Sequence, residues 1–167
     1  MFVDNGRINE ATKFDCLSLP RLDKTFDVCS GSTVLYRLDL AIAYHQIRDA
    51  PSAVNKTALI TYVKRFKILK MLFKLGNALL TYLVLISIVL RGFIFQICCA
   101  YFDDEIVFCC RVVQHLEDLF VVFTRIFGAG FKFKAPKCQL LSDNVSNLSH
   151  IINASGVCID LAKLRVC

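Results

Sequence analysis

The stretch "CCAYFDDEIVFCC", residues 98–110, sets three consecutive acids between two strongly apolar runs. Adjacent carboxylates repel one another and are costly to bury, so acids in this setting suggest a ligand. The flanking runs are typical of two buried strands, and the acids then fall at the turn between them. We therefore expect a β-hairpin with Asp103 and Asp104 at the edge of a sheet and with Glu105 solvated. An ordinary solvated turn is the alternative reading of the acids alone.

Segments on either side of the hairpin extend this prediction. The tract "STVLYRLDLAIAYHQI" alternates like a strand and leaves Asp39 near the strand's end. Two short strands joined by a basic turn around Lys64 and Arg65 are predicted within "NKTALITYVKRFKILKMLF". "VVQHLEDLFVVFTRIFGAGF" predicts an amphipathic helix that stops at Gly128 and Gly130. The residues that recur at helical spacing are Val113, Leu116, Leu119, Phe120, Phe123 and Phe127. A helix crossing a sheet within one α+β domain is the expected architecture.

The apolar run "ALLTYLVLISIVL", residues 78–90, raises the alternative of a small membrane protein. Together with "FIFQICCAYF" it approaches the roughly 20 residues needed to cross a bilayer. Arg91 would then lie near the bilayer centre, where charge is unfavourable, and Gly92 interrupts the run. We therefore expect a helix, a break and a strand, and no membrane partner.

Composition narrows the function classes. Of the 167 residues, 56% are hydrophobic, and the net charge of +6 favours a polyanionic partner such as nucleic acid, although the basic residues are spread out. The nine cysteines include no C-x-x-C pair, which indicates reduced and mostly buried thiols rather than a zinc site or disulfide framework. His45, His115 and His150 lack metal-ligand spacing, and structural roles are expected for all three.

The acids permit one specific chemistry if a third carboxylate joins them. Two-metal phosphoryl transfer needs carboxylates that hold two cations roughly 3.5–4 Å apart. Asp39 is the candidate, because it ends a predicted strand that could lie beside the acidic hairpin. A site made only of oxygen ligands suits Mg²⁺ and equally Mn²⁺.

Six blocks in order carry a family resemblance: "VDNGRINEATKFDCLSLPRLD", "RLDLAIAYHQI", "KTALITYVKRFKILKMLFKLGNALLTY", "YFDDEIVF", "HLEDLFVVFTRIFGAGFKFKAPKC" and "NLSHIINASGV". Together they resemble the reverse transcriptase domain of Ty3/gypsy-type LTR retrotransposon Pol polyproteins. The resemblance implies an α+β polymerase palm with partial fingers, an antiparallel sheet with helices packed on one face, and a missing thumb. By this resemblance residues 1–32 and 50–73 are partial fingers, and residues 33–49 and 74–167 are palm.

The same resemblance implies an RNA-directed DNA polymerase that uses two Mg²⁺ ions to add dNTPs to a primer 3′-hydroxyl. The implied partners are an RNA or DNA template with a DNA primer, dNTPs, and an oligomer or the remainder of a Pol polyprotein. The implied location is the cytoplasm, a virus-like particle or the nucleus.

The resemblance also assigns roles to individual residues of this chain. Catalytic metal ligands would be Asp39, Asp103 and Asp104. Tyr44 would lie under the deoxyribose, Ile42 and Ala43 would present backbone N–H groups to the triphosphate, and Phe73 would line the nucleotide pocket. Primer support would come from Leu148, Ser149 and His150. From the residues alone, Lys132, Lys134 and Lys137 could follow a nucleic-acid backbone or form the solvated face of a strand.

Departures from the family pattern support a second hypothesis. Lys74 stands where a glycine is expected, and Leu72 and Leu79 replace prolines. Gly6 occupies a usual arginine position, and Ser149 replaces a turn glycine. Apolar residues also fill usually polar positions of the helix after Asn77, namely Leu83, Val84 and Ile88. The alternative is a catalytically inactive transposon relic with at most nucleic-acid or protein binding.

Overall fold

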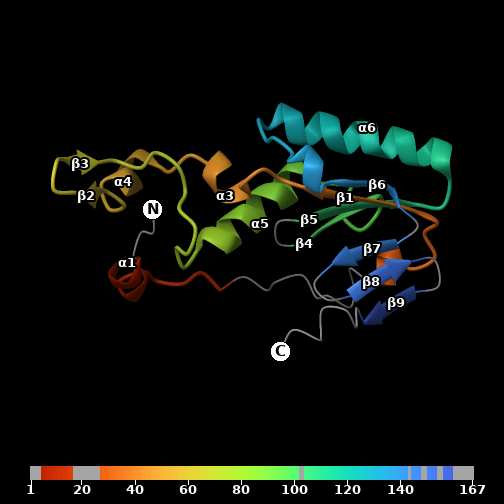
Figure 1. Cartoon of the computed structure of the whole chain (residues 1–167), viewed down its shortest axis with the longest axis horizontal. Helices are drawn as coiled ribbons and strands as arrows, with labels where there is room; N and C mark the ends of the chain where they lie inside the picture. The colour runs from red at the N-terminus through yellow and green to blue at the C-terminus, as the bar shows by residue number, and fades with distance from the viewer. Residues whose placement is uncertain are drawn as a thin grey trace.

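A computed structural model of the chain describes residues 5–16, 27–101, 104–142, 144–147, 150–153 and 156–159. Helices and strands alternate irregularly along these residues (Figure 1). The helices are α1 (Gly6–Glu10), α3 (Ala43–Gln46), α4 (Pro51–Val54), α5 (Ala78–Val89), α6 (Val112–Gly128) and the 3₁₀ turn η1 (Ala135–Lys137). The strands are β1 (Val34–Asp39), β2 (Leu59–Ile60), β3 (Arg65–Phe66), β4 (Cys98–Tyr101), β5 (Asp104–Cys109), β6 (Gln139–Ser142), β7 (Asn144–Asn147), β8 (His150–Asn153) and β9 (Gly156–Ile159).

The central sheet has the strand order β4-β5-β1-β6, and every pairing in it is antiparallel. The predicted acidic hairpin is present as β4 and β5, although β4 begins at Cys98 because residues 90–97 form turns after α5. Gly92, at φ +87°, supplies a left-handed residue in those turns. Strand β1 then pairs with β5 along its whole length, from Val34 opposite Cys109 to Asp39 opposite Asp104.

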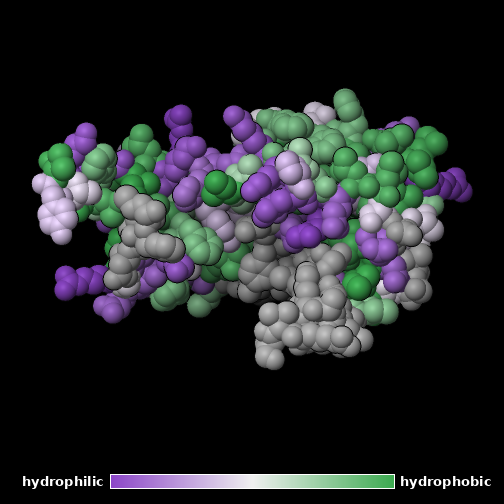
Figure 2. All heavy atoms as spheres, viewed as in Figure 1, coloured by the Kyte–Doolittle hydropathy of each residue, from purple (hydrophilic) through white to green (hydrophobic). Residues whose placement is uncertain are grey.

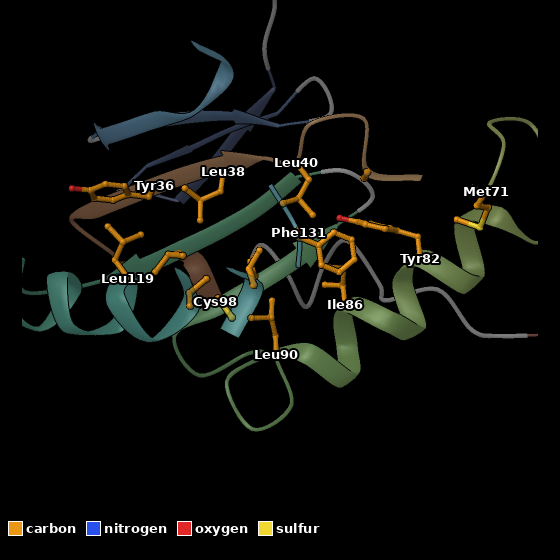
Figure 3. Packing of buried hydrophobic residues seen from close by; sticks show 14 of the residues in the cluster. Tyr36, Leu38, Leu40, Met71, Tyr82, Ile86, Leu90, Cys98, Leu119 and Phe131 are labelled. Atoms are coloured by element: carbon orange, nitrogen blue, oxygen red, sulfur yellow. The ribbon is translucent and has the colours of Figure 1, made fainter. Parts of the chain in front are cut away.

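One face of the central sheet is covered by α5 and α6 (Figure 3). Alternate residues of β1, including Tyr36 and Leu38, pack there against Tyr82 and Ile86 of α5 and Leu119 of α6. Because side chains alternate along a strand, this single face buries half of β1 and leaves the other half for the opposite side. The expected α+β fold, an antiparallel sheet with helices on one face, is confirmed.

The opposite face carries a smaller core under the antiparallel sheet β7-β8-β9. Leu35 and Ile106 of the central sheet pack there with Val145 and Ile152 of the small sheet, and with Cys29 from the helical turn at residues 27–29. The central sheet is therefore buried on both faces over its middle, which explains the apolar runs around the acidic hairpin.

The other end of the molecule holds α1, α4 and the hairpin β2-β3 (Figure 1). The hairpin lies where the sequence predicts it, with residues 61–64 forming its turn. Asn9 of α1 donates to the carbonyl oxygen of Lys74 at 2.9 Å and accepts from the Gly76 N–H at 2.9 Å. The N-terminal segment thus fixes the loop that follows Phe73.

Several expectations from sequence need correction. Glu105 is fully buried rather than solvated, because its side chain points to the helix-covered face. On α6, His115, Leu119, Val122 and Ile126 face the sheet, whereas Val113, Leu116, Phe120 and Phe127 are exposed. Hydrophobic residues accordingly gather on the outer surface along α6 (Figure 2).

The cysteines need a similar correction. All eight cysteines in the described ranges are free thiols, but only Cys29, Cys98 and Cys99 are buried. Burial, together with the Glu105 and Asp118 carboxylates, raises the pKa of the Cys98 thiol to about 12. Within the described ranges, no helix combines the length and the apolar character that crossing a bilayer requires.

Candidate functional site

Two of the three predicted carboxylates meet at one end of the central sheet. Asp39 is the last residue of β1 and Asp104 is the first of β5, and the two are directly opposite in the antiparallel register. Directly opposite residues project from the same face with adjacent Cβ atoms. Asp39 is only 8% exposed. Asp103, the third predicted carboxylate, lies outside the described residues.

Each carboxylate has a cationic partner. The Nη2 atom of Arg37 lies 2.9 Å from Oδ2 of Asp104, and Nζ of Lys137 lies 3.3 Å from Oδ2 of Asp39. Arg37 precedes Asp39 by two residues on β1, so both side chains are on the same face of the sheet. The negative charge that two adjacent carboxylates concentrate is therefore balanced by one arginine and one lysine.

Backbone pairing continues beyond the end of β1 and fixes the next loop. The Lys134 N–H donates to the Asp39 carbonyl oxygen at 2.8 Å, and the Ala41 N–H donates to the Lys132 carbonyl oxygen at 2.8 Å. The side chain of Gln46 donates to both the Ala41 and Lys132 carbonyl oxygens and accepts from the Lys132 N–H. Helix α3 and the segment before η1 are thereby held together beside Asp39.

A pocket of about 210 Å³ opens at this point. It is lined by Asp39, Leu40, Ile42, Ala43, Tyr44, His45, Phe73, Lys134 and Lys137. All four predicted nucleotide-contacting residues are among these. The rings of Tyr44 and Phe73 are 5.8 Å apart in an edge-on arrangement, so the two aromatic side chains form one wall. The pocket therefore combines a carboxylate, aromatic rings and two lysines.

Two residues near the pocket have left-handed backbone conformations that side chains disfavour. Ile42 has φ +51° and Lys74, directly after Phe73, has φ +67°. A β-branched residue in this region is a strong outlier, and glycine would adopt either conformation freely. The expectation that Lys74 occupies a position suited to glycine is thus matched by the backbone. Lys74 thus adopts a backbone conformation that glycine would accommodate better.

The donor chemistry fits a divalent cation. Asp39 and Asp104 present carboxylate oxygens from adjacent strands, and hard cations such as Mg²⁺ prefer such ligands. Across the part of the chain that the structure describes, no cluster of three or more His, Cys, Asp or Glu side chains is placed to hold a metal. The described site therefore offers two carboxylates. The predicted third ligand, Asp103, is the residue before Asp104 in the sequence.

Of the three predicted primer-supporting residues, the structure describes only His150. His150 is the first residue of β8 and lies opposite Asn147 of β7. Leu148 and Ser149, which connect these two strands, lie outside the described residues. A hairpin is present where one is expected, but its role in supporting a primer stays a prediction.

His115 and His45 have different surroundings. His115 is fully buried against the ring of Tyr36, with ring centroids 4.4 Å apart, and burial lowers its pKa while the nearby Asp118 carboxylate partly offsets this. His45 is exposed and lines the pocket. A structural role therefore fits His115, whereas His45 is positioned for a ligand contact that its sequence context did not indicate.

Sequence reasoning missed two cationic contacts. Arg37 could have been found from strand alternation, since residues two apart in a strand share a face. Lys137 had no such signal, because 98 residues separate it from Asp39 in the chain. Its contact depends on how the segment before β6 returns to the end of β1.

The sequence of this chain is similar to those of known proteins. A family model described as "Reverse transcriptase (RNA-dependent DNA polymerase)" matches residues 5–152. The Pol polyprotein from transposon 297 of Drosophila melanogaster is 30% identical over 155 residues, covering 93% of this chain and 15% of that protein. The Pol polyprotein from transposon gypsy of the same fly is 25% identical, covering 99% of this chain and 16% of that protein. The chain thus spans under a fifth of these relatives.

Solved structures show the same fold. The foamy viral protease-reverse transcriptase in complex with dsDNA superposes with a TM-score of 0.87, at 17% sequence identity. The superposition covers 100% of this chain and 35% of the viral one. At this identity the likeness establishes the arrangement of helices and strands alone.

Proposed function

Because this chain belongs to the reverse transcriptase (RNA-dependent DNA polymerase) family, as a domain of the retrotransposon Pol type, we propose that it catalyses template-directed addition of deoxynucleotides to a primer. One observation carries this proposal: Asp39 and Asp104 lie directly opposite each other beside a pocket that holds aromatic and basic side chains. Two carboxylates next to a pocket with two lysines suit phosphoryl transfer, which depends mainly on positioning and charge stabilisation.

Asp39, Asp104 and Asp103 would hold the divalent cations, with Mg²⁺ as the first choice and Mn²⁺ as a substitute. Bound cations would neutralise the triphosphate and lower the pKa of the primer 3′-hydroxyl. Arg37 and Lys137 each contact one carboxylate oxygen, Oδ2 of Asp104 and Oδ2 of Asp39, so a cation bound at these oxygens would compete with both side chains.

The pocket residues would bind and orient the incoming dNTP. Lys134 and Lys137 supply positive charge for the triphosphate, and Tyr44 and Phe73 supply an apolar wall for the sugar and base. Gln46 holds α3 beside the segment that precedes η1 through its hydrogen bonds to Ala41 and Lys132. An RNA or DNA template with a DNA primer would be the macromolecular partner, and the net charge of +6 favours a polyanion.

Primer extension tests the proposal. The full chain is incubated with Mg²⁺, dNTPs and a DNA primer on an RNA template, next to Asp39→Asn and Asp104→Asn. Each substitution is expected to lower incorporation by at least about 100-fold, because metal-ion charge stabilisation supplies several kcal/mol. Asp27→Asn, an exposed aspartate elsewhere, is the matched control and should extend primers like the parent chain. Extension that survives both site substitutions contradicts the proposal.

A catalytically inactive nucleic-acid-binding protein is the second candidate. The observation that favours it is the strained backbone beside the pocket, with Lys74 held at φ +67°, together with cations already paired to both carboxylates. This candidate predicts binding to an RNA/DNA hybrid in a filter assay without any primer extension. Arg7, Lys13 and Lys56, which line a pocket of about 580 Å³ near α1, would contribute to such binding.

A further inference from the structure

Helix α5 is tied to the strand that carries Asp104 by one buried hydrogen bond. The Tyr82 hydroxyl donates to Oε1 of Glu105 at 2.5 Å, and both side chains are fully buried. In Figure 3, Tyr82 extends from α5 toward the central sheet. Burying a carboxyl group is unfavourable unless it is hydrogen-bonded, so this contact strongly constrains where β5 lies relative to α5.

The bond acts on the side of β5 opposite to Asp104. Glu105 follows Asp104 directly, and successive side chains of a strand point to opposite faces. Glu105 pairs with Leu38 in the register and joins the core under the helices, while Asp104 faces Arg37 on the other side. A shift of Glu105 by a fraction of an ångström would therefore move the Asp104 carboxylate through the shared backbone.

The other end of the contact reaches the nucleotide pocket. The Tyr82 ring lies 5.7 Å from the Tyr44 ring, which in turn lies 5.8 Å from Phe73. Tyr44 and Phe73 both line the pocket beside Asp39. A continuous series of contacts thus joins the aromatic wall of the pocket to the strand that begins with Asp104.

We propose that the Tyr82–Glu105 hydrogen bond positions the Asp104 carboxylate relative to the nucleotide pocket, so that both residues are positioning residues for the site. The inference rests on the proposed function for its catalytic meaning. The mechanical link itself, from α5 to β5, does not depend on turnover, and hydrogen exchange can test it without any polymerase activity.

Four variants separate positioning from general stability. Tyr82→Phe removes only the donor, and Glu105→Gln retains an acceptor oxygen. The double variant Tyr82→Phe/Glu105→Leu removes the bond without leaving an unpaired carboxyl group in the core. Tyr36→Phe is the matched control, because Tyr36 is a buried tyrosine of the same core that contacts His115 and not the pocket.

Amide hydrogen exchange by mass spectrometry is the first measurement, on the metal-free chains. Tyr82→Phe and the double variant are expected to exchange faster in β4, β5 and α3, with the small sheet β7-β8-β9 unchanged. Glu105→Gln and Tyr36→Phe should leave β4 and β5 as protected as in the parent chain. Unchanged protection of β4 and β5 in the double variant overturns the inference.

Mn²⁺ binding, followed by electron paramagnetic resonance, is the second measurement. Interactions that orient a metal ligand typically change metal affinity by about tenfold or more when they are lost, so the double variant should show a dissociation constant at least about tenfold higher, with Glu105→Gln near the parent value. Equal affinity in the double variant and the parent chain also overturns the inference. If the parent chain binds no Mn²⁺, the metal site of the proposed function fails, and hydrogen exchange alone decides the link.

Discussion

Asp39 lies directly opposite Asp104 where β1 and β5 pair at the end of the central sheet. Two carboxylates in this relation repel each other unless cations lie between or beside them. In this chain Arg37, on β1, pairs with Asp104. Lys137, in the segment before β6, pairs with Asp39. Both cations therefore compete with any divalent metal for the same oxygen atoms, and each can be removed separately.

Removing Arg37 should strengthen metal binding. Arg37→Gln takes a full positive charge away from a position 2.9 Å from Asp104. A unit charge about 4 Å away contributes about 1 kcal/mol even in water, so Mn²⁺ should bind about fivefold more tightly. Titration with Mn²⁺ measures the change, and Arg48→Gln, which removes an arginine outside the pocket lining, should have no effect. Unchanged or weaker Mn²⁺ binding by Arg37→Gln would show that the ion pair does not compete with metal.

Removing Lys137 should affect nucleotide binding more than folding. Its side chain is 59% exposed, and ion pairs of this kind contribute less than about 1 kcal/mol to stability. Lys137→Gln should therefore keep the urea midpoint of the parent chain while raising the dissociation constant for a dNTP about fivefold, since one charge near the triphosphate is lost. Lys67→Gln, an exposed lysine outside the pocket lining, controls for net charge. A large drop in the urea midpoint would assign Lys137 a structural role instead.

Replacing Lys74 by glycine should stabilise the fold. Lys74 adopts φ +67°, a conformation that costs a residue with a side chain about 1 kcal/mol relative to glycine. Lys74→Gly keeps the carbonyl oxygen that accepts from Asn9 and is expected to raise the free energy of unfolding by up to about 1 kcal/mol. Urea denaturation measures this change. Lys67 is not in the left-handed region, so Lys67→Gly should lower the free energy of unfolding. A lower free energy of unfolding in both variants would contradict the strain at Lys74.

His115 should make the protein less stable in acid. Burial lowers its pKa, with the Asp118 carboxylate acting in the opposite direction, so the unfolded chain binds a proton at a higher pH than the folded one. The stabilising contribution of the neutral ring is complete above the unfolded pKa of about 6.5 and is lost as the pH falls toward the folded pKa. Melting temperatures measured from pH 8 to pH 5 should therefore fall less steeply in His115→Leu than in the parent chain. His45→Gln, at an exposed histidine, should retain the parent slope.

Local sequence patterns predicted the strands that carry Asp39 and Asp104. Continuous apolar runs around the acids predicted the hairpin of β4 and β5, and a helix after Asn77 was found as α5 with nearly the expected bounds. The strand that ends at Asp39 and the short hairpin β2-β3 also lie where alternation and turn residues indicated. These features depend on neighbours a few residues apart, which is why a single sequence reveals them.

The identity of the buried face of α6 was not predictable in the same way. Two apolar series run along this helix, one with Leu119, Val122 and Ile126 and one with Val113, Leu116 and Phe120. Helical spacing alone does not say which series meets the sheet. The structure buries the first series and leaves the second exposed, because β5 and β1 meet the helix from the side of His115.

The sequence by itself determined the family, through the resemblance of six blocks in order. It also determined strands β1 to β5 and the acids at strand ends, since those follow from residue type and short-range periodicity. Only the tertiary structure decided that β1 pairs with β5 so that Asp39 meets Asp104, that Lys137 returns across 98 residues to the same carboxylate, and that Glu105 turns inward to Tyr82. Strand pairing and burial are long-range choices, because a strand's alternation defines two faces without naming the partner that covers each.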